Sequence, residues 1–275
     1  MPFHTLFFLS AIAGLVGAVS GMGGGVILVP TLVFFGFDIK HTIAISNLSI
    51  AALSVTTTWG YLRRHMPSLT MSTFLEVFAV LGAWLGAWVT IYSGRRPLFF
   101  LCGGILLISG MLLSSKQKEY KSARPPDGFS QWLGIQGSYY DYTDHRTETY
   151  FGHNAMLAGF LMFGVGLVSG ALGIGASALT CLILEGVTGL PTKVSLSTSP
   201  LIVGIMALIG TDIYIESGLM NSGLVAPVLL GVPCGALLGI RLFVHLDRRV
   251  VRGIFLAVLV IFAMEMFVFG IRGTR

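Results

Sequence analysis

Residues 20–30 read S-G-M-G-G-G-V-I-L-V-P and interrupt an otherwise apolar N-terminal stretch. Four glycines in five positions predict a helix break, since each glycine destabilises a helix interior by roughly 1 kcal/mol relative to alanine. The flanking segments, 3–18 and 26–35, look like membrane helix. Within a membrane, irregular backbone is tolerated only where protein buries it or where it lines a wet cavity. The stretch therefore predicts a glycine-broken or re-entrant helix beside a cavity.

The composition is that of an integral membrane protein. Of the 275 residues, 54% are hydrophobic and only 11% are charged, against about a quarter in soluble domains. We expect an all-α, multi-pass protein of the cell membrane, in which a net charge of +5 reflects orientation in the lipid bilayer and not affinity for nucleic acid. Apolar segments fall at about 4–36, 41–62, 70–93, 97–114, 153–185, 192–215, 219–245 and 250–271.

The eight segments form two similar halves. Residues 17–21, G-A-V-S-G, recur as residues 166–170, G-L-V-S-G, and Gly23 and Gly25 correspond to Gly173 and Gly175. Other matches keep a spacing of about 150 residues. The sequence therefore predicts two tandem membrane repeats, residues 1–115 and 153–275, joined by a polar central loop at residues 116–152.

The distribution of lysine and arginine favours inverted repeats. If all eight segments cross the membrane, these residues divide nine against eight between the two sides. If each glycine-broken segment enters and leaves on one face, they divide twelve against five, which fits the basic excess of cytoplasmic loops. Each half would then cross three times, so the second half would be an inverted copy, as in alternating-access transporters. A single crossing by the broken segment remains the alternative.

Polar residues follow each glycine stretch, within segments that must be buried. Residues 46–58 read S-N-L-S-I-A-A-L-S-V-T-T-T, and residues 195–199 read S-L-S-T-S. Hydroxyl and amide donors suit an oxyanion, and the free N–H groups at a helix break attract one. Alternatively, these side chains bond to the helix backbone or to a neighbouring helix. The candidate substrate-binding residues are Gly23, Gly24, Gly25, Ser46, Asn47, Gly173, Gly175, Ser197 and Thr198.

Charged residues near these segments allow two interpretations. The cations at helix ends could guide an anionic substrate, or they could extend to the membrane interface. These are Lys40, His41, Arg63, Arg64 and Lys193. Glu76, Glu185 and Glu265 lie within or beside apolar segments, where a protonatable carboxyl could couple transport to a proton gradient.

Other glycines predict helix packing, and the lack of catalytic motifs argues against an enzyme. Gly82 and Gly86, and likewise Gly231, Gly235 and Gly239, are spaced four apart, which predicts close helix packing. No nucleophile elbow, H-E-x-x-H or P-loop lysine is present, and the three cysteines lack ligand spacing. We therefore expect no enzyme, no metal and no cofactor.

The glycine stretch with Pro30 and the following Ala-x-Ser-Asn helix resemble the TauE/SafE family of membrane transporters. The second copy, at residues 169–175 with Lys193, Ser197 and Thr198, is similar, and the likeness covers roughly 10–114 and 155–270. It implies seven or eight membrane segments in two repeats and substrates among sulfur-containing anions, with export of sulfite or organosulfonates. It places the candidate glycines, Asn47, Ser197 and Thr198 at the substrate cavity. The long polar central loop departs from the family's pattern.

The preferred hypothesis is a secondary transporter that carries a small sulfur oxyanion such as sulfite by alternating access. An anion channel with the glycine breaks as its filter is one alternative. A non-transporting membrane scaffold, whose tyrosine-rich central loop binds a partner, is another. The sequence leaves the anion, the coupling ion and the formation of a homodimer open.

Overall fold

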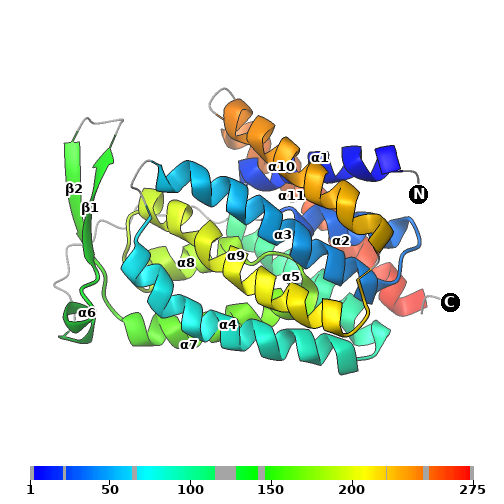
Figure 1. Ribbon diagram of the computed structural model, residues 1–275, viewed down its shortest axis with the longest axis horizontal. Helices are drawn as coiled ribbons and strands as arrows, with labels where there is room; N and C mark the ends of the chain where they lie inside the picture. The colour runs from blue at the N-terminus through cyan, green and yellow to red at the C-terminus, as the bar shows by residue number, and fades with distance from the viewer. Residues whose placement is uncertain are drawn as a thin grey trace.

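The computed structural model describes residues 3–20, 23–63, 67–114, 128–141, 146–220, 222–243 and 248–272, which are almost entirely helical (Figure 1). The first half contains α1 (Phe3–Ser20), α2 (Gly25–Phe34), α3 (Ile39–Leu62), α4 (Leu69–Tyr92) and α5 (Arg95–Ser114). Then come α6 (Gly128–Trp132) and the strands β1 (Gln136–Asp141) and β2 (Arg146–Phe151). The second half contains α7 (Ala155–Leu172), α8 (Ser177–Gly186), α9 (Thr192–Glu216), α10 (Ser222–Phe243) and α11 (Arg248–Arg272).

The length and composition of these helices fit a membrane. Among the described residues, α4, α7, α9 and residues 223–240 of α10 are long and apolar enough to span a bilayer. Many large hydrophobic side chains face outward, as lipid contact requires. The prediction of an all-helical, multi-pass membrane protein is confirmed for the membrane part, and the short two-stranded sheet is an addition to it.

Both glycine stretches interrupt a helix. Helix α1 ends at Ser20 and α2 begins at Gly25, while α7 ends at Leu172 and α8 begins at Ser177. Gly23 and Gly173 have φ angles of 87° and 60°, in the left-handed region that glycine adopts without steric cost. The backbone therefore leaves the helix where the sequence provides residues that can turn.

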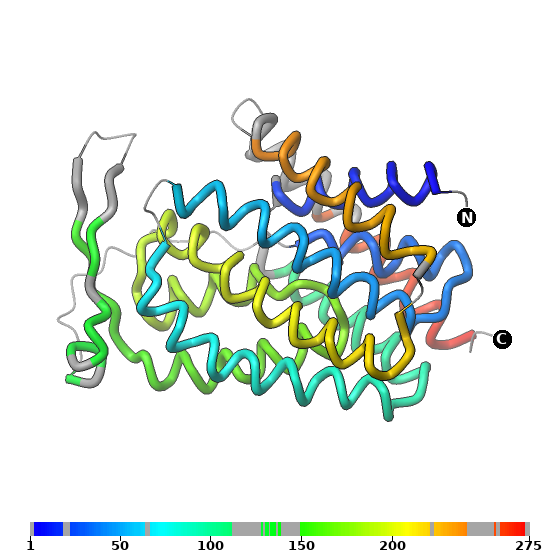
Figure 2. Tube along the Cα trace, viewed as in Figure 1, coloured from blue at the N-terminus to red at the C-terminus, as the bar shows by residue number. Residues whose placement is uncertain are grey.

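After each break the chain folds back beside the helix it has just left. The backbone N–H of His153, before α7, donates to the carbonyl oxygen of Thr188, after α8, at 3.0 Å. The second broken segment therefore starts and ends at the same place. In the first, a Cβ on Gly24 would lie 3.2 Å from the Ala13 carbonyl oxygen, so α2 begins alongside α1. Figure 2 shows the start of α1 and the α2–α3 connection at the same end of the molecule.

The two halves interlock instead of forming separate bodies. Helix α1 packs along α10, α4 along α7, α3 along α9 and α5 along α11. In Figure 1, α4 and α7 lie together on one side of the molecule and α1 and α10 on the other. Most extensive helix contacts thus join an element of the first half to one of the second.

Glycines allow two of these contacts to be backbone against backbone. A Cβ on Gly82 or Gly86 of α4 would collide with carbonyl oxygens of α7. On α10, a Cβ on Gly231, Gly235 or Gly239 would collide with carbonyl oxygens of α1. The close packing predicted for these five glycines is confirmed.

Helices α3 and α9 run antiparallel through the centre and define two ends of the molecule. At the start of α3, Nδ1 of His41 lies 2.6 Å from the carbonyl oxygen of Leu219, just after α9. Beyond the other end of α3, the backbone N–H of Ser68 donates to Oγ1 of Thr198, near the start of α9, at 3.0 Å. We call the second of these the hairpin end, since β1 and β2 lie there, and the first the termini end (Figure 1).

Part of the predicted polar central loop folds into secondary structure. Strands β1 and β2 pair antiparallel, from Gln136 opposite Phe151 to Asp141 opposite Arg146. Ile135 and Tyr150 are buried in the same core cluster as residues of α4 and α7. Burial raises the pKa of the Tyr150 hydroxyl, which makes a hydrogen bond with Ser68. The hairpin is thus attached to the start of α4.

Candidate functional site

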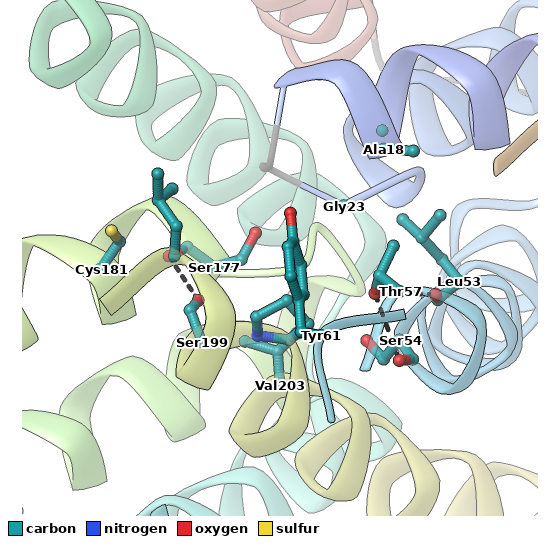
Figure 3. Close-up of a pocket in the computed structure, with 13 residues that line it drawn as sticks. Ala18, Gly23, Leu53, Ser54, Thr57, Tyr61, Ser177, Cys181, Ser199 and Val203 are labelled. Carbon is teal, nitrogen blue, oxygen red and sulfur yellow. Dashed lines mark hydrogen bonds between the residues drawn. The ribbon is translucent and has the colours of Figure 1, made fainter. Parts of the chain in front are cut away.

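A cavity of about 50 Å³ lies between the two helix breaks (Figure 3). Since one buried water needs roughly 10–15 Å³, the space admits several waters or a small ion. The first break and the end of α1 contribute Gly17, Ala18 and Gly23; α3 contributes Leu53, Ser54, Thr57 and Tyr61; α8 contributes Ser177 and Cys181; α9 contributes Leu196, Ser199, Pro200 and Val203.

The lining is polar but uncharged. Five hydroxyl groups and one thiol surround the space, on Ser54, Thr57, Tyr61, Ser177, Ser199 and Cys181. Among the described lining residues none carries a charge. Helix α8 begins at Ser177, so the positive end of its dipole lies at the cavity. Neutral donors and a helix N-terminus suit a small anion, because they stabilise negative charge without a permanent counter-ion.

The two breaks touch each other beside this cavity. A Cβ on Gly23 would lie 3.3 Å from Cα of Gly175. A Cβ on Gly25 would collide with the carbonyl oxygen of Gly173. These four candidate residues are therefore brought together. Gly24 packs against α1, and of the nine candidate binding residues Gly23 is the one that lines the cavity.

On the termini side of the breaks, hydroxyl groups cap the end of α7. The Tyr214 hydroxyl of α9 donates to the Gly170 carbonyl oxygen at 2.7 Å. Thr90 of α4 donates to the Ala171 carbonyl oxygen, and Ser46 of α3 to that of Gly173, each at 2.5 Å. We call Tyr214, Thr90 and Ser46 the hydroxyl clamp. All three are buried, so the packed clamp separates the cavity from the termini end.

The cavity itself faces the hairpin end. Its lining residues on α3, from Leu53 to Tyr61, come from the half of that helix nearer the hairpin end. Those on α9, from Leu196 to Val203, come from the corresponding half of α9. The two helices thus enclose a space on one side of the breaks and pack tightly on the other.

The predicted side-chain donors lie outside the cavity lining. The Ser46 hydroxyl belongs to the clamp, and Asn47 Nδ2 donates to the Ile43 carbonyl oxygen at 3.2 Å. Ser197 and Thr198 both donate to the Val194 carbonyl oxygen, at 2.9 and 2.7 Å. These are the backbone contacts that the sequence offered as the alternative. Their part in substrate binding stays a prediction.

Several residues that line the cavity were not among the predicted binding residues. Ser54, Thr57 and Tyr61 are spaced three and four apart, so they share one face of α3. That spacing was a usable signal, because the polar stretch 46–58 includes two of them. Ser199 likewise closes the second polar stretch. Ser177 and Cys181 stand in an apolar segment without any pattern that would single them out.

The candidate guiding cations divide between the two ends. At the termini end, Lys40 Nζ donates to the Ile91 carbonyl oxygen at 2.7 Å, near the end of α4, and His41 contacts Leu219. At the hairpin end, the Arg63 guanidinium lies 4.6 Å from the centre of the Trp59 ring, and Lys193 is half-buried at the start of α9. Arg64 lies outside the described residues.

Comparison with known proteins decides the family. The family model "Sulfite exporter TauE/SafE" matches residues 6–266. The chain belongs to the TauE/SafE family. The resemblance seen in the glycine stretches is thereby confirmed, together with the expectation of a membrane transporter.

Two similar proteins from Bacillus subtilis (strain 168) are named as membrane transporters. The "Probable membrane transporter protein YunE" is 24% identical over 282 residues, which cover 98% of this chain and 99% of that protein. The "Probable membrane transporter protein YdhB" is 26% identical over 246 residues, covering 90% of each. No solved structure matches this TauE/SafE chain.

Proposed function

We propose that this chain is a secondary transporter that carries a small sulfur oxyanion, with sulfite as the preferred candidate, through the cavity between the helix breaks. The observation that carries the proposal is an uncharged, hydroxyl-lined cavity where two glycine breaks meet, in a TauE/SafE chain. The family description supports the choice of anion, and the cavity geometry supports the choice of site.

The chemistry of the lining suits transport better than tight storage. An anion that leaves water loses its hydration, and the hydroxyl groups and the α8 N-terminus would replace part of it. A permanent cation in the cavity would hold the anion too strongly for release, and the described lining carries none. At the hairpin end, Arg63 and Lys193 would raise the local anion concentration near the cavity.

Alternating access would follow from inverted repeats, comprising residues 1–115 and 153–275 on either side of the 116–152 segment. The order of helices α1 to α5 parallels that of α7 to α11, and the packing of α1 on α10 has its counterpart in α7 on α4. Tyr61 and Tyr214 are separated by about the repeat spacing of 150 residues. Tyr61 lines the cavity while Tyr214 belongs to the clamp, so exchange of these roles would open the opposite face.

The inverted topology predicts opposite labelling of two exposed positions. Phe35 follows α2, and Gly186 ends α8. Single cysteines at these positions, in a background without the three native cysteines, should react with a membrane-impermeant thiol reagent from opposite sides of the membrane. Reaction of both from the same side would contradict the inversion. Each variant is first shown to retain the thermal stability of the cysteine-free parent.

The transport function predicts saturable sulfite flux by the purified chain in proteoliposomes. Sulfite should also raise the melting temperature in detergent more than sulfate or chloride does, because only a bound ligand stabilises the folded state by mass action. Flux that rises linearly without saturation would favour an anion channel. No flux, together with no stabilisation by any small oxyanion or sulfonate, would favour a scaffold.

A further inference from the structure

A buried carboxyl group lies beyond the cavity, near the C-terminal end of α8 and on the same helix face as Ser177 and Cys181. Cys181 lines the cavity, and its thiol donates to Oε1 of Glu185 at 3.3 Å, one helical turn further along α8. The Glu185 side chain is buried, at 6% exposure, and makes a second hydrogen bond with Thr192 at the start of α9. The carboxyl is thus separated from the cavity by a single hydrogen-bonding side chain.

Three other carboxyl groups of the membrane helices lack this connection. Glu76 on α4 accepts a hydrogen bond from Ser72 at 2.8 Å, and Ser72 is no part of the cavity lining. Glu265 on α11 has a buried Oε1 for which the described residues supply no hydrogen-bond partner. Asp212 is exposed on the half of α9 nearer the termini end. Among these described groups, Glu185 alone is hydrogen-bonded to a residue of the cavity.

We infer that Glu185 carries the proton that couples anion transport to a pH gradient, and that Cys181 positions it against the cavity. This inference rests on the proposed transport function. It names the group that would make anion transport depend on protons. When Glu185 is ionised, its negative charge lies one hydrogen-bonded side chain from the anion and opposes anion binding. When Glu185 takes a proton from the aqueous side to which the cavity is open, that repulsion is removed.

The proton and the anion therefore bind together and are released together. The carboxylate gains one proton when the anion enters and returns it when the anion leaves, so no bond of the anion changes and the charges balance. Such coupling is reciprocal, because a proton that raises the affinity for the anion is itself bound more tightly, by the same factor, when the anion is present. A pH gradient would then drive the anion toward the alkaline side.

The surroundings of Glu185 contain few other ionisable groups. Helix α8 packs against α9, α7 and α5. Helix α7 contributes no titratable residue, and Lys193 stands at the start of α9. On α5, Arg95 pairs with Asp38 at 2.6 Å, near the start of α3 and so at the termini end. The remaining titratable groups on these elements and beside the end of α8 are Cys102 and Arg96 on α5, Asp212, Tyr214 and Glu216 on α9, and His153 before α7.

The test measures two kinds of flux in proteoliposomes that contain the full chain. Gradient-driven sulfite accumulation needs the proton, whereas exchange of labelled for unlabelled sulfite at equal pH needs only binding and the conformational change. Glu185→Gln should lower gradient-driven accumulation by at least about fivefold, in line with typical coupling factors, and leave exchange within about twofold. The matched variants Glu76→Gln and Glu265→Gln should keep both fluxes.

The outcomes separate this inference from the proposed function. Gradient-driven accumulation that survives in Glu185→Gln would overturn the assignment, and so would loss of exchange and accumulation together. If the unmodified chain exchanges no sulfite, the transport function fails before the question of Glu185 arises. Cys181→Ser, which keeps a donor to Glu185, should retain the pH dependence of accumulation, whereas Cys181→Ala should shift its pH profile. Identical pH profiles for these two variants would remove Cys181 from the mechanism.

Discussion

Gly166→Leu should prevent the chain from reaching a stable, monodisperse folded state, whereas Gly164→Leu should leave stability unchanged. Both residues lie on α7, two positions apart. A Cβ on Gly166 would collide with the carbonyl oxygen of Ala79 on α4, whereas a Cβ on Gly164 would meet no atom within 4 Å. Overpacking costs about 1–3 kcal/mol even where side chains can shift, and here the obstacle is backbone.

The expected loss is large because α4 and α7 depend on this close approach. Burial of apolar surface contributes little to association between helices in lipid, so van der Waals contact at small residues provides much of the stability. Gel filtration and thermal unfolding of both variants in detergent provide the measurement. If Gly166→Leu had the same melting temperature as Gly164→Leu, close packing of α4 against α7 would not be needed for stability, and the prediction would be wrong.

Ser54→Leu should strongly reduce sulfite flux while the protein still folds. Ser54 lines the cavity, and on its other side it packs against α9, where a Cβ on Gly204 would lie 2.7 Å from the Ser54 Cβ. A larger side chain can therefore extend only into the cavity. It would fill much of the space of about 50 Å³ and remove one hydroxyl group. Pocket contacts of this size change rates by about 10–200-fold, and we expect a loss in that range.

Val55→Leu is the matched control for this substitution. Val55 is adjacent on α3 but 64% exposed, on the side that faces away from the cavity. Flux through Val55→Leu should equal that of the unmodified chain. Initial rates at several sulfite concentrations, measured for both variants at equal protein content, test the prediction. A folded Ser54→Leu protein with unchanged rates would remove the cavity from the transport path.

The helix breaks and the close helix contacts could be predicted because both depend on glycine. A run of glycines weakens a helix wherever it stands, and glycines four apart fall on one helix face whatever the partner is. A few neighbouring residues are therefore enough to predict the structural roles of Gly23, Gly86 and Gly235. The position of the cavity does not follow in this way.

Which hydroxyl groups face the cavity depends on the rotation of α3 and α9 about their own axes. In the stretch 46–58, polar side chains spread over a broad arc of the helix, so the cavity-facing residues Ser54 and Thr57 do not stand out from Ser46 and Asn47. Ser46 faces the end of α7, and Ser54 faces the cavity, because the neighbouring helices fix that rotation. The β-hairpin was missed for a related reason, since Ile135 and Tyr150 join a core only when residues of α4 and α7 meet them.

The interlocked arrangement has a consequence for biogenesis. Helix α1 is synthesised first, yet its main partner, α10, leaves the ribosome near the end of translation. Helix α4 likewise waits for α7. The first half must therefore remain in the bilayer as inserted but unassembled helices, with its glycine faces uncovered, until the second half arrives. We therefore expect the packing of α1 and α4 in this transporter to be completed only after the second half has been inserted.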